Sequence, residues 1–228
     1  MLISLITAVI IGFTAWGLSD NIGRWISGIW PWDWGAETFA TIASVFGALV
    51  IIAIGLILYK HIIMALSAPF MSPVSEKIET HVLGEDHAHR DTSFNAQLWR
   101  GIRINVRNLS LELLLTIPIL LFSLIPIIGI IGTILLFLVQ AYYAGFGNMD
   151  YTLERHYNYD KSVQFVRNHK GHAIGNGIVF MLFLLIPIVG VILVLPISVT
   201  AATVQTIDLL DSDTKQQFPK AEENKQLS

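Results

Sequence analysis

Four long stretches of this 228-residue sequence contain no Lys, Arg, Asp or Glu. They cover residues 1–18, 38–59, 113–149 and 173–207, so all 14 basic and all 17 acidic residues lie between or after them. A bilayer core of about 30 Å requires about 20 apolar residues in a helix, whose backbone satisfies its own hydrogen bonds. The sequence therefore predicts an all-α integral membrane protein with one membrane domain over residues 1–207.

The first two stretches predict two long transmembrane helices, at residues 1–18 and 38–59. A signal peptide is the alternative for 1–18, although no Lys or Arg precedes the apolar run. The connector 60–112 holds six Lys and Arg residues, whereas the loop 19–37 holds only Arg24. By the positive-inside rule, the connector and the C-terminus are expected on the cytoplasmic side. The polar tail 208–228 is expected to be disordered.

The third and fourth stretches predict two helical hairpins, over residues 113–149 and 173–207. Pro126 with Gly129, and Pro187 with Gly190, mark the expected tips, because Pro stops a helix and Gly permits the positive φ of a tight reversal. The arms before these prolines reach only about 20 Å, which is too short to cross a bilayer. We therefore expect hairpins that penetrate only part of the membrane, with two tilted full spans as the alternative.

The two hairpins resemble each other in sequence. Residues 124–131 and 185–192 share six identities in eight positions, and Val-Arg-Asn recurs at 106–108 and 166–168. This pattern indicates an internal duplication, in which the two tips meet and line a path through the membrane. Ordinary kinks within a packed helical bundle remain the alternative.

Basic residues precede each hairpin. An amphipathic stretch before the first carries Arg103 and Arg107 on one face, and the approach to the second carries Arg167 and Lys170. Guanidinium groups and the start of a helix, expected near Gly175, both suit oxyanions, so these four cations are the candidate anion-binding residues. The alternatives are contact with lipid headgroups and a solvated basic loop.

Signs of an enzyme are absent from the sequence. It contains no cysteine and no nucleophile elbow, phosphate-binding loop or HExxH signature, so neither catalytic residues nor a cofactor are expected. The composition gives no indication of nucleic-acid binding. An acidic, His-rich segment over residues 79–89 could hold a metal ion, but a solvated loop is the default interpretation and no metal site is predicted.

The segment Ser67-Ala68-Pro69-Phe70, interpreted as a turn and followed by Glu76, resembles the CysZ sulfate permeases and the wider etoposide-induced-protein membrane family. The resemblance continues through both hairpins and the Asp150-Tyr151 pair, over about residues 1–207. It implies two long transmembrane helices, two partly penetrating hairpins, and an oligomer that brings sulfate into the cytoplasm. Family members carry paired arginines before the first membrane helix, whereas this sequence begins within that predicted helix. Either the start of the sequence is assigned too far downstream, or the chain is a divergent branch of the family. No sulfate-binding residue of the family is therefore transferred to this sequence.

Together these observations predict a transporter or channel for a small inorganic oxyanion, above all sulfate, in a bacterial inner membrane. The expected partners are the lipid bilayer, the oxyanion and further copies of the same chain. The alternative function is a membrane protein that transports nothing and organises partners or lipids through its basic helix.

Overall fold

The structure is a computed structural model that describes residues 6–7, 9–14, 17, 28, 35–84, 92–123, 126–186 and 189–217. All regular secondary structure in these residues is helical. The chain divides into two compact units, Met1–Ile63 and Met64–Ser228, and most of the described contacts lie within the second. Much of the predicted first span, 1–18, lies outside the described residues, although residues 9–14 are helical.

Helix α2 runs from Ala36 to Leu83 and contributes to both units. Its 48 residues correspond to about 72 Å, so the predicted span 38–59 is only part of one long helix. The described portion that is long and apolar enough to cross a membrane is Ile57–Leu83. The predicted connector 60–112 therefore begins as a continuation of α2 and is not a loop.

Pro69 and Pro73 both lie inside α2, so the expected turn at residues 67–70 is wrong. A proline within a helix removes the hydrogen bond to the carbonyl four residues earlier, which leaves the Ala65 carbonyl without its helical donor. Gly101 of the next helix approaches this carbonyl, and a Cβ built on Gly101 would lie 3.0 Å from the Ala65 oxygen. Close packing by a neighbouring helix is one way in which membrane helices accommodate proline.

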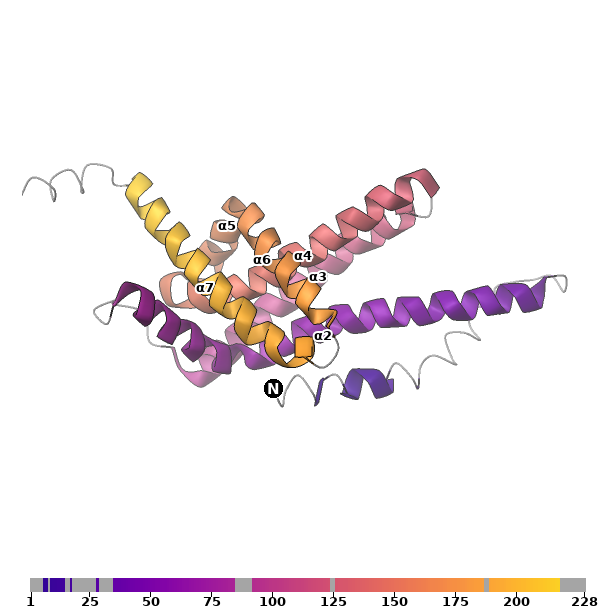
Figure 1. The fold of residues 1–228 in the computed structure, drawn as a ribbon, viewed down its shortest axis with the longest axis horizontal. Coiled ribbons are helices and arrows are strands. Elements are labelled where there is room, and N and C mark those ends of the chain that lie inside the picture. The colour runs from indigo at the N-terminus through magenta and orange to yellow at the C-terminus, as the bar shows by residue number, and fades with distance from the viewer. Residues whose placement is uncertain are drawn as a thin grey trace, which may run out of the picture. The chain divides into compact units, whose positions relative to one another are not determined.

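The described part of the second unit contains five further helices (Figure 1). They are α3 (Phe94–Ser123), α4 (Pro126–His156), α5 (Tyr159–Asn168), α6 (Lys170–Leu184) and α7 (Val189–Gln217). Helices α3 and α4 pack against each other, as do α6 and α7, and each pair is joined by a short connection. Helix α3 ends at Ser123 and α4 begins at Pro126, while α6 ends at Leu184 and α7 begins at Val189, so both breaks between helices fall beside the predicted tips.

The glycines at the two tips act differently from the prediction. Pro126 is the first residue of α4, a favoured place for proline, and Gly129 lies within the helix. A Cβ on Gly129 would lie 2.7 Å from the Ser123 carbonyl oxygen, and one on Gly190 would overlap the Phe183 carbonyl. These glycines are therefore required for close approach of consecutive helices and not for a positive φ. Pro187 lies outside the described residues.

The inner arms of the two hairpins, α4 and α6, make the most extensive helix contact. A Cβ on Gly145 would overlap the carbonyl of Ala173, and a Cβ on Gly177 would overlap that of Ala141. Each helix thus presents two small residues four positions apart, the spacing that lets membrane helices approach backbone to backbone. Beside this crossing, Asn176 accepts a 2.8 Å hydrogen bond from Asn148 and donates one to the Ser198 carbonyl.

Apolar side chains fill the centre of the second unit and also cover the ends of its hairpins. The buried cluster draws on α3 to α7, with Ile104, Phe146, Met149, Leu153, Phe165, Val166, Ala173 and Ala202. Large apolar side chains at the outer end of the first hairpin are instead exposed, including Leu114, Ile117, Phe122, Ile130 and Ile131. Such a surface is unsuited to water and suits lipid.

The arms of the two hairpins differ in length. Besides Ile57–Leu83, the described residues contain two apolar stretches long enough to cross a membrane, Gly129–His156 and Leu193–Lys215. These are the returning arms, whereas α6 has only 15 residues, or about 22 Å. The length argument concerned the arms before Pro126 and Pro187: the second is the short helix α6, whereas the first is the end of the 30-residue helix α3. Residues 208–217 of the tail expected to be disordered are helical, because α7 continues to Gln217.

Candidate anion-binding cavity

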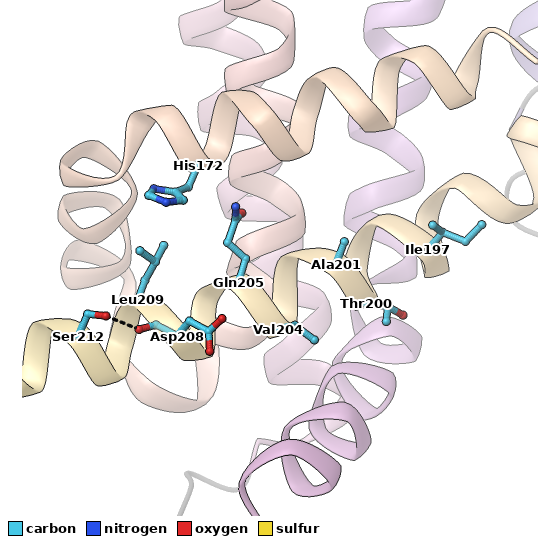
Figure 2. A pocket seen from close by; sticks show the side chains of 9 residues that line it. All are labelled: His172, Ile197, Thr200, Ala201, Val204, Gln205, Asp208, Leu209 and Ser212. Atoms are coloured by element: carbon cyan, nitrogen blue, oxygen red, sulfur yellow. Dashed lines mark hydrogen bonds between the residues drawn. The ribbon is translucent and has the colours of Figure 1, made fainter.

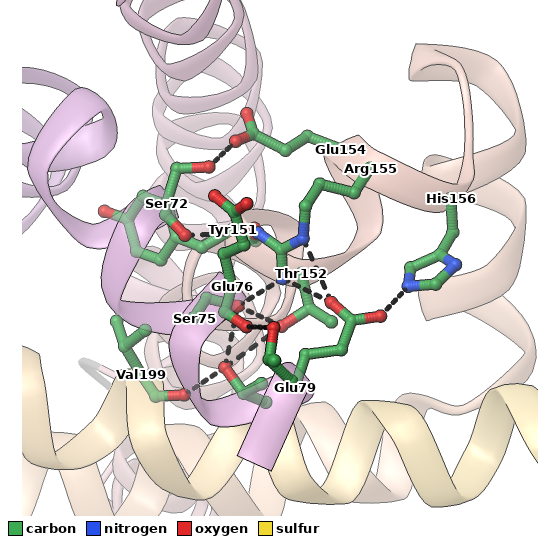
Figure 3. A network of polar contacts seen from close by, with 12 residues as sticks. Ser72, Ser75, Glu76, Glu79, Tyr151, Thr152, Glu154, Arg155, His156 and Val199 are labelled. Atoms are coloured by element: carbon green, nitrogen blue, oxygen red, sulfur yellow. Dashed lines mark hydrogen bonds and ion pairs between the residues drawn. The ribbon is translucent and has the colours of Figure 1, made fainter. Parts of the chain in front are cut away.

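One set of charged side chains in the second unit is buried and fully paired. Arg155 of α4 and Glu79 of α2 lie 2.7 Å apart, both almost completely shielded from solvent. All five guanidinium N–H groups of Arg155 donate hydrogen bonds: two to Glu79 and one each to the Ser75 hydroxyl and the carbonyls of Ser72 and Tyr151 (Figure 3). Because every N–H group of Arg155 is engaged, this arginine holds the surrounding helices together and has no donor left for a ligand.

Hydroxyl groups extend the same network to α7. Ser75 and Thr152 are hydrogen-bonded at 2.9 Å, and Thr203 of α7 contacts both (Figure 3). His156 lies 2.5 Å from the second Glu79 oxygen, and Ser72 donates to Glu154. Three helices are thus linked through buried polar contacts, which are costly to leave unmatched in a low-dielectric interior.

A second arginine is also committed to structure. Arg100 of α3 forms a bidentate pair with Asp150 of α4, at 3.1 and 2.8 Å, and also donates to Ser162 and the Tyr157 carbonyl. Burial favours the neutral guanidinium, but the Asp150 carboxylate outweighs it, and the pKa of Arg100 is raised above its ordinary value. The Arg100 guanidinium is therefore permanently charged, and its donors are engaged by other groups of the protein.

A different arrangement surrounds a cavity of about 290 Å³ where four helices meet. Arg107 of α3, Arg167 of α5 and Lys170 of α6 line it together with Tyr142 and Tyr143 of α4. Its remaining walls are apolar, formed by Leu111, Leu115, Leu135, Leu138, Val139 and Ile174. We name this space the cationic cavity.

The three cations of the cationic cavity have no carboxylate partner among the described residues. Arg107 donates a 2.9 Å hydrogen bond to the side chain of Asn108, and its guanidinium lies 5.4 Å from the centre of the Phe146 ring. Lys170 is also the first residue of α6, so the positive end of that helix dipole lies at the cavity wall. Positive charge beside an apolar wall, with no carboxylate paired to it among the described residues, is an arrangement that attracts a small anion.

Three of the four cations singled out from the sequence therefore meet at one cavity, and Arg103 does not. Arg103 is exposed, and its guanidinium stacks 4.0 Å from the centre of the Tyr159 ring. The repeated Val-Arg-Asn places Arg107 and Arg167 at the same cavity but in different settings. Arg107 lies inside the continuous helix α3, whereas Arg167 is near the end of α5, before the break at His169. Helix α6 begins at Lys170, so the expected helix start near Gly175 is wrong.

A larger groove, of about 840 Å³, lies along α7 but does not suit an anion (Figure 2). His172 of α6 faces Leu209 across it, and Gln205 and Thr200 add neutral polar groups. Its charged wall residue is Asp208, and neither lysine nor arginine lines it. A carboxylate without a neighbouring permanent cation disfavours negative ligands.

The residues that carry the family resemblance are structural in their contacts. Ala68 is buried against Gly101, and Phe70 packs edge-to-face on Phe94 with ring centres 5.8 Å apart. Glu76 lies on the helix turn of α2 that also presents Ser75 and Glu79 to the buried network (Figure 3). Among the described residues no group of three or more metal-binding side chains forms a metal site, and Glu85 to His89 lie outside them.

Sequence reasoning missed the two tyrosines of the cationic cavity and the whole Arg155 network. Tyr142 and Tyr143 stand in an uncharged apolar stretch, where they give no sign of lining a site. The pairing of Arg155 with Glu79 joins residues 76 positions apart, which one sequence cannot reveal. The small-residue spacing of Ala141 with Gly145, and of Ala173 with Gly177, was a readable signal for the α4 and α6 contact.

Two comparisons with known proteins show which sequences this chain resembles. The family model described as "Sulfate transporter CysZ/Etoposide-induced protein 2.4" matches residues 1–195. A protein of Pseudomonas fluorescens named "Sulfate transporter CysZ" is 30% identical over 141 residues, which are 60% of this chain and 56% of the relative. The match thus spans little more than half of the relative's length. Because the family model covers most of the sequence, the chain belongs to the CysZ and etoposide-induced protein 2.4 family of membrane proteins.

Proposed function

We propose that the protein is a transporter or channel that moves a small inorganic oxyanion, above all sulfate, across a bacterial inner membrane into the cytoplasm. The observation that carries this proposal is the convergence of Arg107, Arg167 and Lys170 on one cavity without a carboxylate partner among the described residues. The name of the relative supports sulfate as the ion. Permeation requires no chemical step, so the proposal includes no catalytic residue and no cofactor.

The cationic cavity has the properties that selective binding of such an ion needs. Guanidinium groups offer planar pairs of donors that match two oxygens of a tetrahedral oxyanion. Its apolar wall lowers the local dielectric, which strengthens each contact with the ion. A volume of about 290 Å³ is small for a ligand pocket, since drug-sized ligands occupy about 300–1,000 Å³. The cavity therefore favours an inorganic ion over a large organic anion.

In this proposal the two hairpins reach only part of the way through the membrane at α6, and the cations stand at the cytoplasmic end of the route. The short length of α6 supports partial penetration, and the basic connector supports a cytoplasmic position for Arg107. Several copies of the chain assemble so that protein covers the irregular hairpin tips within the lipid. The connector and the C-terminus lie in the cytoplasm.

Proteoliposomes test the proposal directly. Purified protein should take up labelled sulfate faster than empty vesicles, and Arg107→Ala combined with Arg167→Ala should reduce the uptake strongly. Arg103→Ala is the matched control, because it removes a guanidinium from the same helix but outside the cationic cavity. Wild-type flux equal to that of empty vesicles would contradict transport, and full flux in the double variant would remove the cavity from the mechanism.

The alternative, a membrane protein that organises lipids, has one specific observation in its favour. Trp99 and Val106 of α3 are 68% and 57% exposed and flank the exposed Arg103, which is an interfacial pattern. Reconstituted protein that moves no sulfate, yet retains anionic lipids through purification in an Arg103-dependent manner, would favour this second function.

A further inference from the structure

A line of polar side chains runs along one face of α3. Asn105, Asn108, Glu112 and Thr116 are spaced by three, four and four residues, which places them on the same side of a helix. We name this surface the polar face of α3. It extends over about 16 Å, from the basic part of the helix into the uncharged stretch that begins at Leu113.

The polar face is buried within the hairpin. Asn108 and Glu112 are completely shielded, and Asn105 is 4% exposed. A Cβ on Gly147 of α4 would lie 3.8 Å from the Asn105 side-chain oxygen, so this face is directed toward the second arm. The residues of α3 that are turned outward are apolar instead, with Leu114 and Ile117 65% and 59% exposed. The helix thus reverses the usual order of a water-soluble protein, with polar groups inside and apolar groups outside.

Two groups on this face lack hydrogen-bond partners among the described residues. The Nδ2 amide of Asn108 and the Oγ1 hydroxyl of Thr116 are both buried and unmatched. Leaving such a group buried and unsatisfied destabilises the fold. Buried water is the usual partner where several polar groups lie within reach of one another.

The polar face also borders the cationic cavity. Arg107, Leu111 and Leu115 form the α3 wall of the cavity, and each is followed directly by a member of the polar face, Asn108, Glu112 or Thr116. The side-chain oxygen of Asn108 accepts a hydrogen bond from Arg107, which links the two surfaces. A ligand held by Arg107 therefore lies beside the buried amide of Asn108.

We propose that the polar face of α3 is filled with water and continues the cationic cavity toward the tip of the first hairpin. Water satisfies Asn108 and Thr116, and the ion held by Arg107 exchanges for the water beside Asn108. Glu112 lies farther along the face, and its carboxylate disfavours an anion beyond that point. The inference deepens the proposed function and rests on it for the identity of the ion. The presence of water does not depend on that identity.

Cysteine labelling tests this directly, because the natural sequence contains no cysteine and each introduced thiol is unique. Asn108→Cys and Thr116→Cys are compared with Leu114→Cys and Ile117→Cys, in protein reconstituted into lipid nanodiscs. The probe is a charged, membrane-impermeant methanethiosulfonate, which reacts with the thiolate that forms only in contact with water. Labelling at 108 and 116 should be at least about tenfold faster than at 114 and 117.

The near-isosteric Thr116→Cys keeps the test valid if Asn108→Cys does not fold, and the elution profile of each variant reports folding. Labelling at 116 as slow as at 114 and 117 would overturn the water-filled face. Labelling is then repeated with sodium sulfate, and slower reaction at 108 supports an ion bound beside Asn108. Fast labelling that sulfate leaves unchanged would support the hydrated face while counting against sulfate as the transported ion, so the two proposals fail separately.

Discussion

Arg155 and Arg107 belong to adjacent helices of one hairpin. Arg155 nevertheless has the surroundings of a structural arginine, whereas Arg107 has those of a binding residue. Arg155 is buried with every N–H group engaged and a carboxylate at 2.7 Å. Arg107 donates to one neutral amide and lines a cavity with two further cations and no described acid. The comparison teaches that the location of an arginine in a membrane protein says little until its partners are counted. Removing Arg155 should damage the fold, whereas removing Arg107 should damage only binding.

The largest effect is expected for Arg155→Ala. The substitution removes the arginine partner of the buried Glu79 carboxylate and leaves it the contact with His156, which should lower the free energy of unfolding by about 3–5 kcal/mol. Thermal unfolding in detergent, followed by circular dichroism, measures the loss. Arg155→Met combined with Glu79→Met should recover much of it, because an apolar pair of similar volume removes the unmatched charge. An unchanged melting temperature in the single variant would show that this network does not hold the helices together.

Gly177→Ala should have the next largest effect, through the crossing of α4 and α6. Its new methyl group would overlap the Ala141 carbonyl, and separating the helices should cost about 1–3 kcal/mol. Gly175→Ala in the same helix is the matched control, since a methyl group at that position would meet no other atom within 4 Å. The control should be neutral or stabilising by up to about 1 kcal/mol. Equal melting temperatures for both variants would contradict the close crossing.

Arg107→Ala should weaken binding without weakening the fold. Loss of one charge-assisted contact should raise the dissociation constant for sulfate about tenfold, or about 1.4 kcal/mol. Isothermal titration calorimetry with sulfate measures the constant, and thermal unfolding should stay near that of the natural protein. A large drop in the melting temperature would place Arg107 with the structural arginines and erase the contrast with Arg155.

Arg103→Ala should have the smallest effect. Its guanidinium is exposed and stacks on Tyr159, a contact worth about 0.5–1 kcal/mol at such a site. Tyr159→Leu should cause a similar small change in the melting temperature and no further change when combined with Arg103→Ala. Additive losses in the double variant would show that the two side chains act independently.

The sequence predicted the helical class, the hairpins and the position of both reversals, because charge-free stretches and Pro-Gly pairs are local signals. Three of the four cations that it singled out, Arg107, Arg167 and Lys170, line the cationic cavity, because they all stand where a basic approach meets a hairpin. It placed Arg103 with them because helical spacing alone cannot tell which cation has an aromatic neighbour. Their role in binding remains a prediction.

Other errors have a common physical origin in packing between distant segments. The turn expected at Pro69 is a helix, because close packing by Gly101 accommodates the lost hydrogen bond. Gly129 and Gly190 were explained by backbone freedom, whereas the structure requires them for contact with the preceding helix. A neighbour's position changes what a proline or glycine does, and a single sequence does not contain that position.

The crossing of α4 and α6 has a mechanical consequence. Because the two backbones touch at both Gly145 and Gly177, sliding one helix along the other would drive a carbonyl oxygen into a chain atom. The crossing therefore limits how far α4 and α6 can slide, and with it the position of α5, which stands between them in the chain and carries Arg167.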